Sequence, residues 1–63
     1  MTDEQKITRI DHAMDVLGSE IAADTSLGLE TTLNAMSALL AFTRNAPAQS
    51  KVRLFDILTS KEN

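Results

Sequence analysis

Apolar side chains recur at helical spacing near the start of the chain, in steps of 3, 4, 3 and 4 residues: Ile7, Ile10, Met14, Leu17 and Ile21. That spacing is the pattern of an amphipathic helix. Just before it, Thr2 and Gln5 have the spacing of a capping box, with two acidic residues between them. We predict a helix over residues 3–23, in which Gly18 costs about 1 kcal/mol relative to alanine. Gly18 either permits the close approach of another backbone or is a tolerated change without a structural role.

A second helix is predicted over residues 27–44, where two apolar faces run side by side. One face repeats in steps of 4, 3 and 4 residues and contains Leu29, Leu33, Met36 and Leu40. The other face contains Ala35, Leu39 and Phe42. No charged residue lies between Glu30 and Arg44. Because a helix that is apolar around half of its circumference is usually covered on more than one side, we expect this helix to be the central one.

Short connections separate the predicted helices. Asp24, Thr25 and Ser26 are all favoured N-cap residues, and so short a connection usually joins antiparallel neighbours. Asn45 and Pro47 are residues that end a helix. The first two helices are therefore expected to form an antiparallel hairpin.

A third, shorter helix is predicted over residues 48–60. Its apolar stripe, which we expect to dock on the second helix, contains Val52, Phe55 and Leu58. Leu54 and Ile57 lie outside this stripe. They are therefore candidates for contact with another protein.

The fold class follows from these segments and from the absence of any stretch that alternates with a period of two. We predict an all-α fold, a small three-helix protein in which an antiparallel helical hairpin and a shorter C-terminal helix form one domain over residues 1–63. A core of this size rarely supplies more than about 3–5 kcal/mol, and the chain has no cysteine to form a disulfide. We therefore expect a homodimer. The residues expected in the core or the dimer interface are Leu33, Met36, Leu40, Phe42 and Phe55.

Side chains suited to catalysis are sparse. His12 is the only histidine, and with Asp11 and Asp15 it falls short of the four ligands of a typical zinc site, so we interpret it as a surface residue. Gly18 and Gly28 stand alone rather than in a glycine-rich phosphate loop, and no serine lies in a G-x-S-x-G motif. We predict a non-enzymatic protein with no catalytic residue, no cofactor and no metal.

The chain also shows no sign of a membrane segment. Its longest run without a charged residue covers residues 31–43, and these 13 residues are too few to span a bilayer. Asp3 and Glu4 lie where a signal peptide would have a basic and then an apolar segment. The sequence indicates a cytoplasmic protein that does not enter the membrane.

Three short helices would also suit a small DNA-binding protein. Residues 22–33 resemble a helix-turn-helix, but Asp24 occupies a position where alanine usually packs, and the second helix has no Lys or Arg before Arg44. The net charge is −3, and the second half of the chain offers only a weak surface basic patch for phosphate contacts, formed by Arg44, Lys51, Arg53 and Lys61. The sequence thus disfavours nucleic acid as a partner, and a helix-turn-helix-like transcriptional regulator remains the alternative.

Surplus apolar surface is the main indication of function. Val16 lies away from the apolar seam of its helix, and Leu54 and Ile57 lie off the docking stripe of theirs. Arg53 adds a planar guanidinium that can pair with a carboxylate. We predict that these four residues bind a partner protein. The other candidate surface is an acidic stripe of Glu4, Asp11 and Asp15.

In size and class the chain resembles short acidic helical proteins of phages, plasmids and bacteria that bind and disable a target. We therefore hypothesise a small regulator that binds a protein partner and modulates it, most simply as an inhibitor. A structural subunit of a larger assembly, whose third helix packs only in the complex, is a further alternative.

Overall fold

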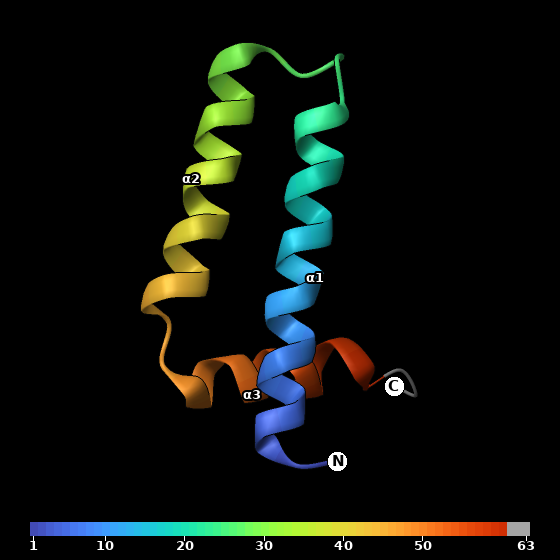
Figure 1. The fold of residues 1–63 in the computed structure, drawn as a ribbon, viewed down its shortest axis with the longest axis vertical. Coiled ribbons are helices and arrows are strands. Elements are labelled where there is room, and N and C mark those ends of the chain that lie inside the picture. The colour runs from blue at the N-terminus through green and yellow to red at the C-terminus, as the bar shows by residue number, and fades with distance from the viewer. Residues whose placement is uncertain (61–63) are drawn as a thin grey trace.

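Three helices make up the fold of residues 1–60, the part of the chain that the computed structural model describes. They are α1 (Asp3–Ala23), α2 (Leu29–Asn45) and α3 (Ala48–Thr59), with no strand in the same residues. The all-α fold and the antiparallel hairpin of the first two helices are confirmed (Figure 1). The predicted bounds are right for α1 and differ by one or two residues for the other two helices.

The order of packing differs from the prediction, because α1 rather than α2 is the central helix. α1 packs against α2 along the hairpin and against α3, which crosses near its N-terminal end (Figure 1). The backbones of α2 and α3 do not pack on each other in the described part of the chain. The prediction that the third helix docks on the second is therefore wrong, because α3 turns beneath the hairpin instead of folding back along α2.

The molecule is flat, with extents of 37 × 27 × 15 Å. A single helix with its side chains is about 10–12 Å across. Most of the hairpin therefore has no second layer over it, and each of its helices keeps an uncovered side.

The turn between α1 and α2 is built by the side chain of Asp24. Its Oδ1 atom accepts hydrogen bonds from the Ser26 amide at 2.9 Å and from the Ser26 hydroxyl at 2.6 Å. The hydrogen bond from the Ser26 hydroxyl, and to a smaller extent that from the Ser26 amide, holds the pKa of Asp24 below its ordinary value. The predicted N-cap role of this segment is wrong, because α2 begins only after Gly28, which caps it without a side chain. Aspartate in a turn commonly bonds to the backbone two residues ahead in this way.

The start of α1 has the predicted capping box. The Gln5 amide donates to the Thr2 hydroxyl at 3.1 Å, and the Thr2 amide donates to the Gln5 side chain at 2.9 Å. Two amides that lack helical partners are thereby satisfied. This local pattern is confirmed.

The core of a single chain lies where α3 crosses α1, and it is small. Its buried hydrophobic side chains, among residues 1–60, are Ile10 of α1 and Val52 of α3. Lys51 is buried beside them, with 7% of the residue exposed. No residue of α2 reaches this degree of burial. The fold is thus anchored at the crossing rather than along the hairpin.

Lys51 joins all three helices from the middle of this core. Its Nζ atom lies 2.8 Å from Asp11 Oδ1 of α1 and donates a hydrogen bond of 2.9 Å to the Thr43 carbonyl of α2. The contact with Asp11 is an ion pair rather than an aligned hydrogen bond. Thr43 lies in the last turn of α2, where carbonyl groups have no partner within the helix. The predictions that place Lys51 in a surface basic patch and Asp11 in a free acidic stripe are therefore wrong.

A second link between α1 and α3 is more exposed. Lys6 Nζ lies 2.9 Å from Asp56 Oδ1, and it also lies 5.8 Å from the centre of the Phe55 ring, within the range of a cation–π contact. The hydrogen bond to Asp56 raises the pKa of Lys6 above its ordinary value. The crossing therefore combines apolar burial with two charged links.

Candidate interaction surface on α2

The two apolar faces of α2 have opposite surroundings. The face of Ala35, Leu39 and Phe42 is half-buried towards the rest of the molecule. The other face exposes three leucines by 76%, 57% and 53%: Leu29, Leu33 and Leu40. We call these three residues the leucine stripe. Met36, between them in sequence, is half-buried.

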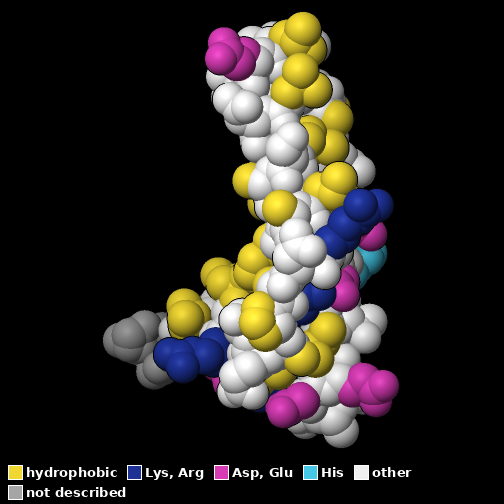
Figure 2. Space-filling model, turned by 90° about the vertical axis from the view of Figure 1, so that its left-hand side faces the viewer, with side chains coloured by type: hydrophobic (Ala, Val, Ile, Leu, Met, Phe, Trp, Pro, Cys, Tyr) yellow, Lys and Arg dark blue, Asp and Glu magenta, His cyan; other side chains and the backbone are white. Residues whose placement is uncertain are grey.

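The direction in which α2 packs explains this exposure. At about 100° per residue, the centre of the stripe lies about 130° around the helix from the packed face. A flat hairpin covers only one side of α2, so the two apolar faces cannot both be buried in one chain. Leu33 and Leu40, which were predicted to lie in the core or a dimer interface, are therefore not part of the core of a single chain. Figure 2, which faces the α2 side, shows hydrophobic side chains along the right-hand edge of the upper arm.

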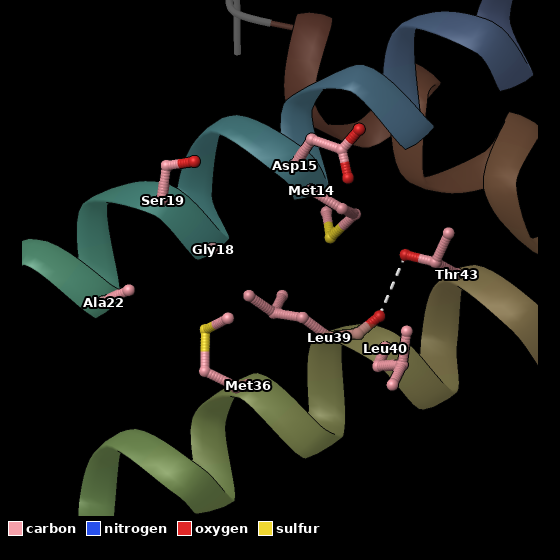
Figure 3. A pocket seen from close by; sticks show the side chains of 9 residues that line it. All are labelled: Met14, Asp15, Gly18, Ser19, Ala22, Met36, Leu39, Leu40 and Thr43. Carbon is pink, nitrogen blue, oxygen red and sulfur yellow. Dashed lines mark hydrogen bonds between the residues drawn. The ribbon is translucent and has the colours of Figure 1, made fainter. Parts of the chain in front are cut away.

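A groove of about 290 Å³ opens between α1 and α2 beside the stripe. Met14 of α1 and Met36 and Leu39 of α2 point into the space between the helices (Figure 3). Leu40 belongs both to the groove wall and to the stripe. Asp15 and Ser19 supply polar groups at the groove. Because methionine side chains adapt their shape readily, this groove suits an apolar side chain of a partner.

Gly18 forms part of the same groove. A Cβ atom built on it would lie 3.7 Å from Met36 Cε and 3.8 Å from Leu39 Cδ1, which are ordinary contact distances. The close approach expected at this glycine is thus by side chains of α2, not by its backbone. An alanine would fit without displacing either neighbour.

Charged residues stand at the two ends of the stripe. Glu30 lies in the first turn of α2 and Arg44 in the last, and both are exposed. Among residues 1–60 the ion pairs are Lys6 with Asp56 and Lys51 with Asp11, so neither Glu30 nor Arg44 takes part in one. Along this surface an acid therefore lies beside the first leucine, and a base lies one turn beyond the last leucine.

The predicted partner-binding residues do not form one surface. On α3, Arg53 and Ile57 are exposed, whereas Leu54 is half-buried. Val16 lies in a separate shallow hollow whose other lining residues, Ser19, Glu20, Ala23 and Asp24, follow it on α1 or in the turn. The structure does not bring Val16 together with the residues of α3.

The predicted docking stripe of α3 also needs correction. Val52 is buried and Phe55 is half-buried at the crossing with α1, but Leu58 is exposed together with Ile57. The last turn of α3 thus carries a second, smaller apolar patch. This patch consists of two exposed side chains, whereas the leucine stripe has three and extends along a longer helix.

The other candidate residues are dispersed. His12 is exposed, and no group of three or more metal-ligating side chains occurs within residues 1–60. No helix in that range is long and apolar enough to cross a membrane. Arg44 and Arg53 are exposed, whereas Lys61 lies outside the described residues. Sequence reasoning placed Leu33 and Leu40 of the leucine stripe in the core or a dimer interface and did not identify the stripe as an exposed surface. The signal for it was the absence of charged residues between Glu30 and Arg44, which made either apolar face of α2 a candidate for exposure.

Comparison of the chain with protein-family models, with curated proteins and with solved structures gives no match. The indications of function therefore lie in the surface itself.

Proposed function

We propose that the protein is a non-enzymatic protein-interaction module whose docking surface is the leucine stripe with the adjoining groove. The exposure of Leu29, Leu33 and Leu40 on one face of a regular helix carries this proposal. Burying a leucine side chain fully is worth about 1.5–3 kcal/mol, so three on one face form a substantial reserve of binding energy. Contiguous apolar surface of this kind marks interaction sites in small proteins.

The spacing of the stripe favours a helical partner. Its leucines lie four and seven residues apart, which places them along one line over three turns of α2. An amphipathic helix presents anchors at matching intervals and packs along such a line. The groove beside Leu40 accepts one further apolar side chain.

In this proposal the protein regulates its partner simply by occupying the partner's binding surface. A module that covers an apolar helix of another protein modulates that protein by blocking its other contacts. Inhibition is the simplest outcome of such binding. The stability at the α1–α3 crossing supports it, because α2 can then present its outer face without unfolding.

The helix-turn-helix alternative has less support. The two helices of that motif cross at about 90–120°, whereas residues 22–33 form the tip of an antiparallel hairpin (Figure 1). Lys51, one of its candidate phosphate contacts, is buried against Asp11. Neither observation favours a DNA-binding surface, so we do not propose one.

The test is site-specific photo-crosslinking in cells that express the protein. A photoreactive residue at position 33 is expected to give an adduct with a protein, and Leu40→Asp in the same chain is expected to abolish it. Position 34, also exposed on α2 but about 100° away from position 33, is the matched control and should give no such adduct. Adducts at position 57 and none at position 33 would move the docking surface to α3 and contradict the proposal.

A further inference from the structure

We propose that the helix that covers the leucine stripe is α2 of a second copy of the same chain, in antiparallel orientation. This inference rests on the proposed function, since it names the occupant of that docking surface. Area, the order of apolar side chains and charge each support it.

The exposed area of one chain exceeds that of an ordinary folded monomer. A monomer of 6.9 kDa is expected to expose about 4,000 Å². This chain exposes 4769 Å². The surplus is of the same order as the roughly 800 Å² that each partner buries in a standard protein interface. One interface of ordinary size would therefore bring the chain to normal coverage.

The stripe is complementary to itself when one copy is reversed. With the two-fold axis level with residues 34–35, Leu29 of one copy lies against Leu40 of the other, and Leu33 lies against Met36. Two-fold symmetry repeats each of these contacts, so all four positions of the apolar repeat meet an apolar partner. A helix pair joined in this way closes on itself and leaves no second stripe to recruit a third copy.

Charge selects the antiparallel orientation. A parallel pair would place Glu30 beside Glu30 and Arg44 beside Arg44, which is unfavourable at both ends. In the antiparallel pair, Glu30 of one copy approaches Arg44 of the other. Both side chains lean towards the N-terminus of their own helix, and these directions point at each other across the interface. Neither residue has an ion pair of its own within residues 1–60 that would have to break first.

The shape of the molecule leaves room for this arrangement. In Figure 2 the foot formed by α3 projects to the left, while the row of hydrophobic side chains runs along the right-hand edge of the upper arm. The foot therefore lies on the side away from that edge.

The first test measures mass and charge dependence together. Sedimentation equilibrium of the full chain at micromolar concentration is expected to give twice 6.9 kDa. Leu33→Asp should give monomers, whereas the control Asn34→Asp should remain dimeric. Glu30→Arg and Arg44→Glu should each weaken the dimer about tenfold, because two symmetry-related pairs are lost at once. The double variant should recover wild-type affinity, which no partner with other residues would produce.

The second test fixes the orientation and uses the absence of cysteine from the chain. A mixture of Leu29→Cys and Leu40→Cys proteins is expected to form the mixed disulfide on mild oxidation, because disulfides require Cα atoms within about 7 Å. Disulfides of Leu29→Cys with itself would overturn the antiparallel pairing.

The outcomes separate this inference from the proposed function. A monomeric wild-type chain at all concentrations overturns the dimer. If the adduct at position 33 in cells then contains a different protein, the docking surface stands with another occupant. If no adduct forms, both proposals fail.

Discussion

The contact of α1 with α3 and its contact with α2 differ in how tightly they are packed. The crossing with α3 contains the buried hydrophobic side chains Ile10 and Val52 and the charged links of Lys51 and Lys6. The hairpin contact with α2 contains a groove, a glycine and half-buried side chains. Most of the stability of one chain is therefore concentrated at the end where α3 crosses α1. The outer face of α2, the most apolar helix, is left uncovered. This arrangement is expected of a scaffold that presents a helix for binding.

The largest expected effect comes from breaking the crossing at its centre. Ile10 is 2% exposed, and Ile10→Ala should lower the free energy of unfolding by about 2–4 kcal/mol. That loss is most of what a core of this size supplies, at about 3–5 kcal/mol. Urea unfolding followed by circular dichroism measures it. Leu29→Ala is the control on the hairpin side, and in dilute solution it should change stability little, because Leu29 is exposed. Equal effects of the two variants would contradict the comparison.

Lys51 tests whether its link also fastens α2 to the crossing. Lys51→Met keeps the length of the apolar stem but leaves the Asp11 carboxylate without its ion pair and the Thr43 carbonyl without its donor. We expect a loss of about 2 kcal/mol, since unpaired buried polar groups cost about 1–3 kcal/mol each and Asp11 is only partly buried. Hydrogen exchange should then show faster opening at the C-terminal turn of α2. Unchanged exchange in that turn would mean that Lys51 matters only to α3.

Gly18 offers the opposite change, a strengthening of the hairpin. Because an added Cβ has room beside Met36 and Leu39, Gly18→Ala should raise the free energy of unfolding by about 0.5–1 kcal/mol. Thermal unfolding at fixed protein concentration measures the gain. A loss of stability would show that the helices approach more closely than these distances indicate.

The smallest effects separate the two regions by pH. The pKa of Asp24 is lowered by its bonds from Ser26, so its contribution to stability is present above the pKa of the unfolded chain and is lost as the pH falls through the folded value. The pKa of Lys6 is raised by Asp56, so its contribution is present below the unfolded pKa and is lost as the pH rises through the folded value. Acid should therefore loosen the hairpin turn, whereas alkali should loosen the crossing. Titration by NMR checks both directions, with Ser26→Ala and Asp56→Asn as the matched controls.

Local features of this fold could be predicted from the sequence, because they depend on neighbouring residues. The capping box of Thr2 and Gln5 and the bounds of α1 required only the spacing of residues within the helix. The antiparallel hairpin followed from a short connection between two amphipathic segments. These predictions did not require knowledge of which helices touch.

Tertiary features could not be predicted, for two physical reasons. Both faces of α2 are apolar, so periodicity alone could not decide which one faces α1. Lys51 is charged and was assigned to the surface, yet its long stem lets it lie in the core and end on two oxygen atoms from different helices. The candidate site was misplaced because the side of α2 that packs against α1 and the position of α3 together determine which apolar side chains remain exposed.

The bond between Lys6 and Asp56 joins residues 50 positions apart, and this separation has a consequence for biosynthesis. The ribosome makes α1 and α2 before α3, so the hairpin emerges without the contacts that anchor it. Until α3 is complete, the nascent chain lacks the buried side of its core, and we expect it to remain only partly ordered. Folding should therefore be completed only once α3 has emerged, and a chain that stalls before α3 should be a preferred substrate for chaperones and proteases.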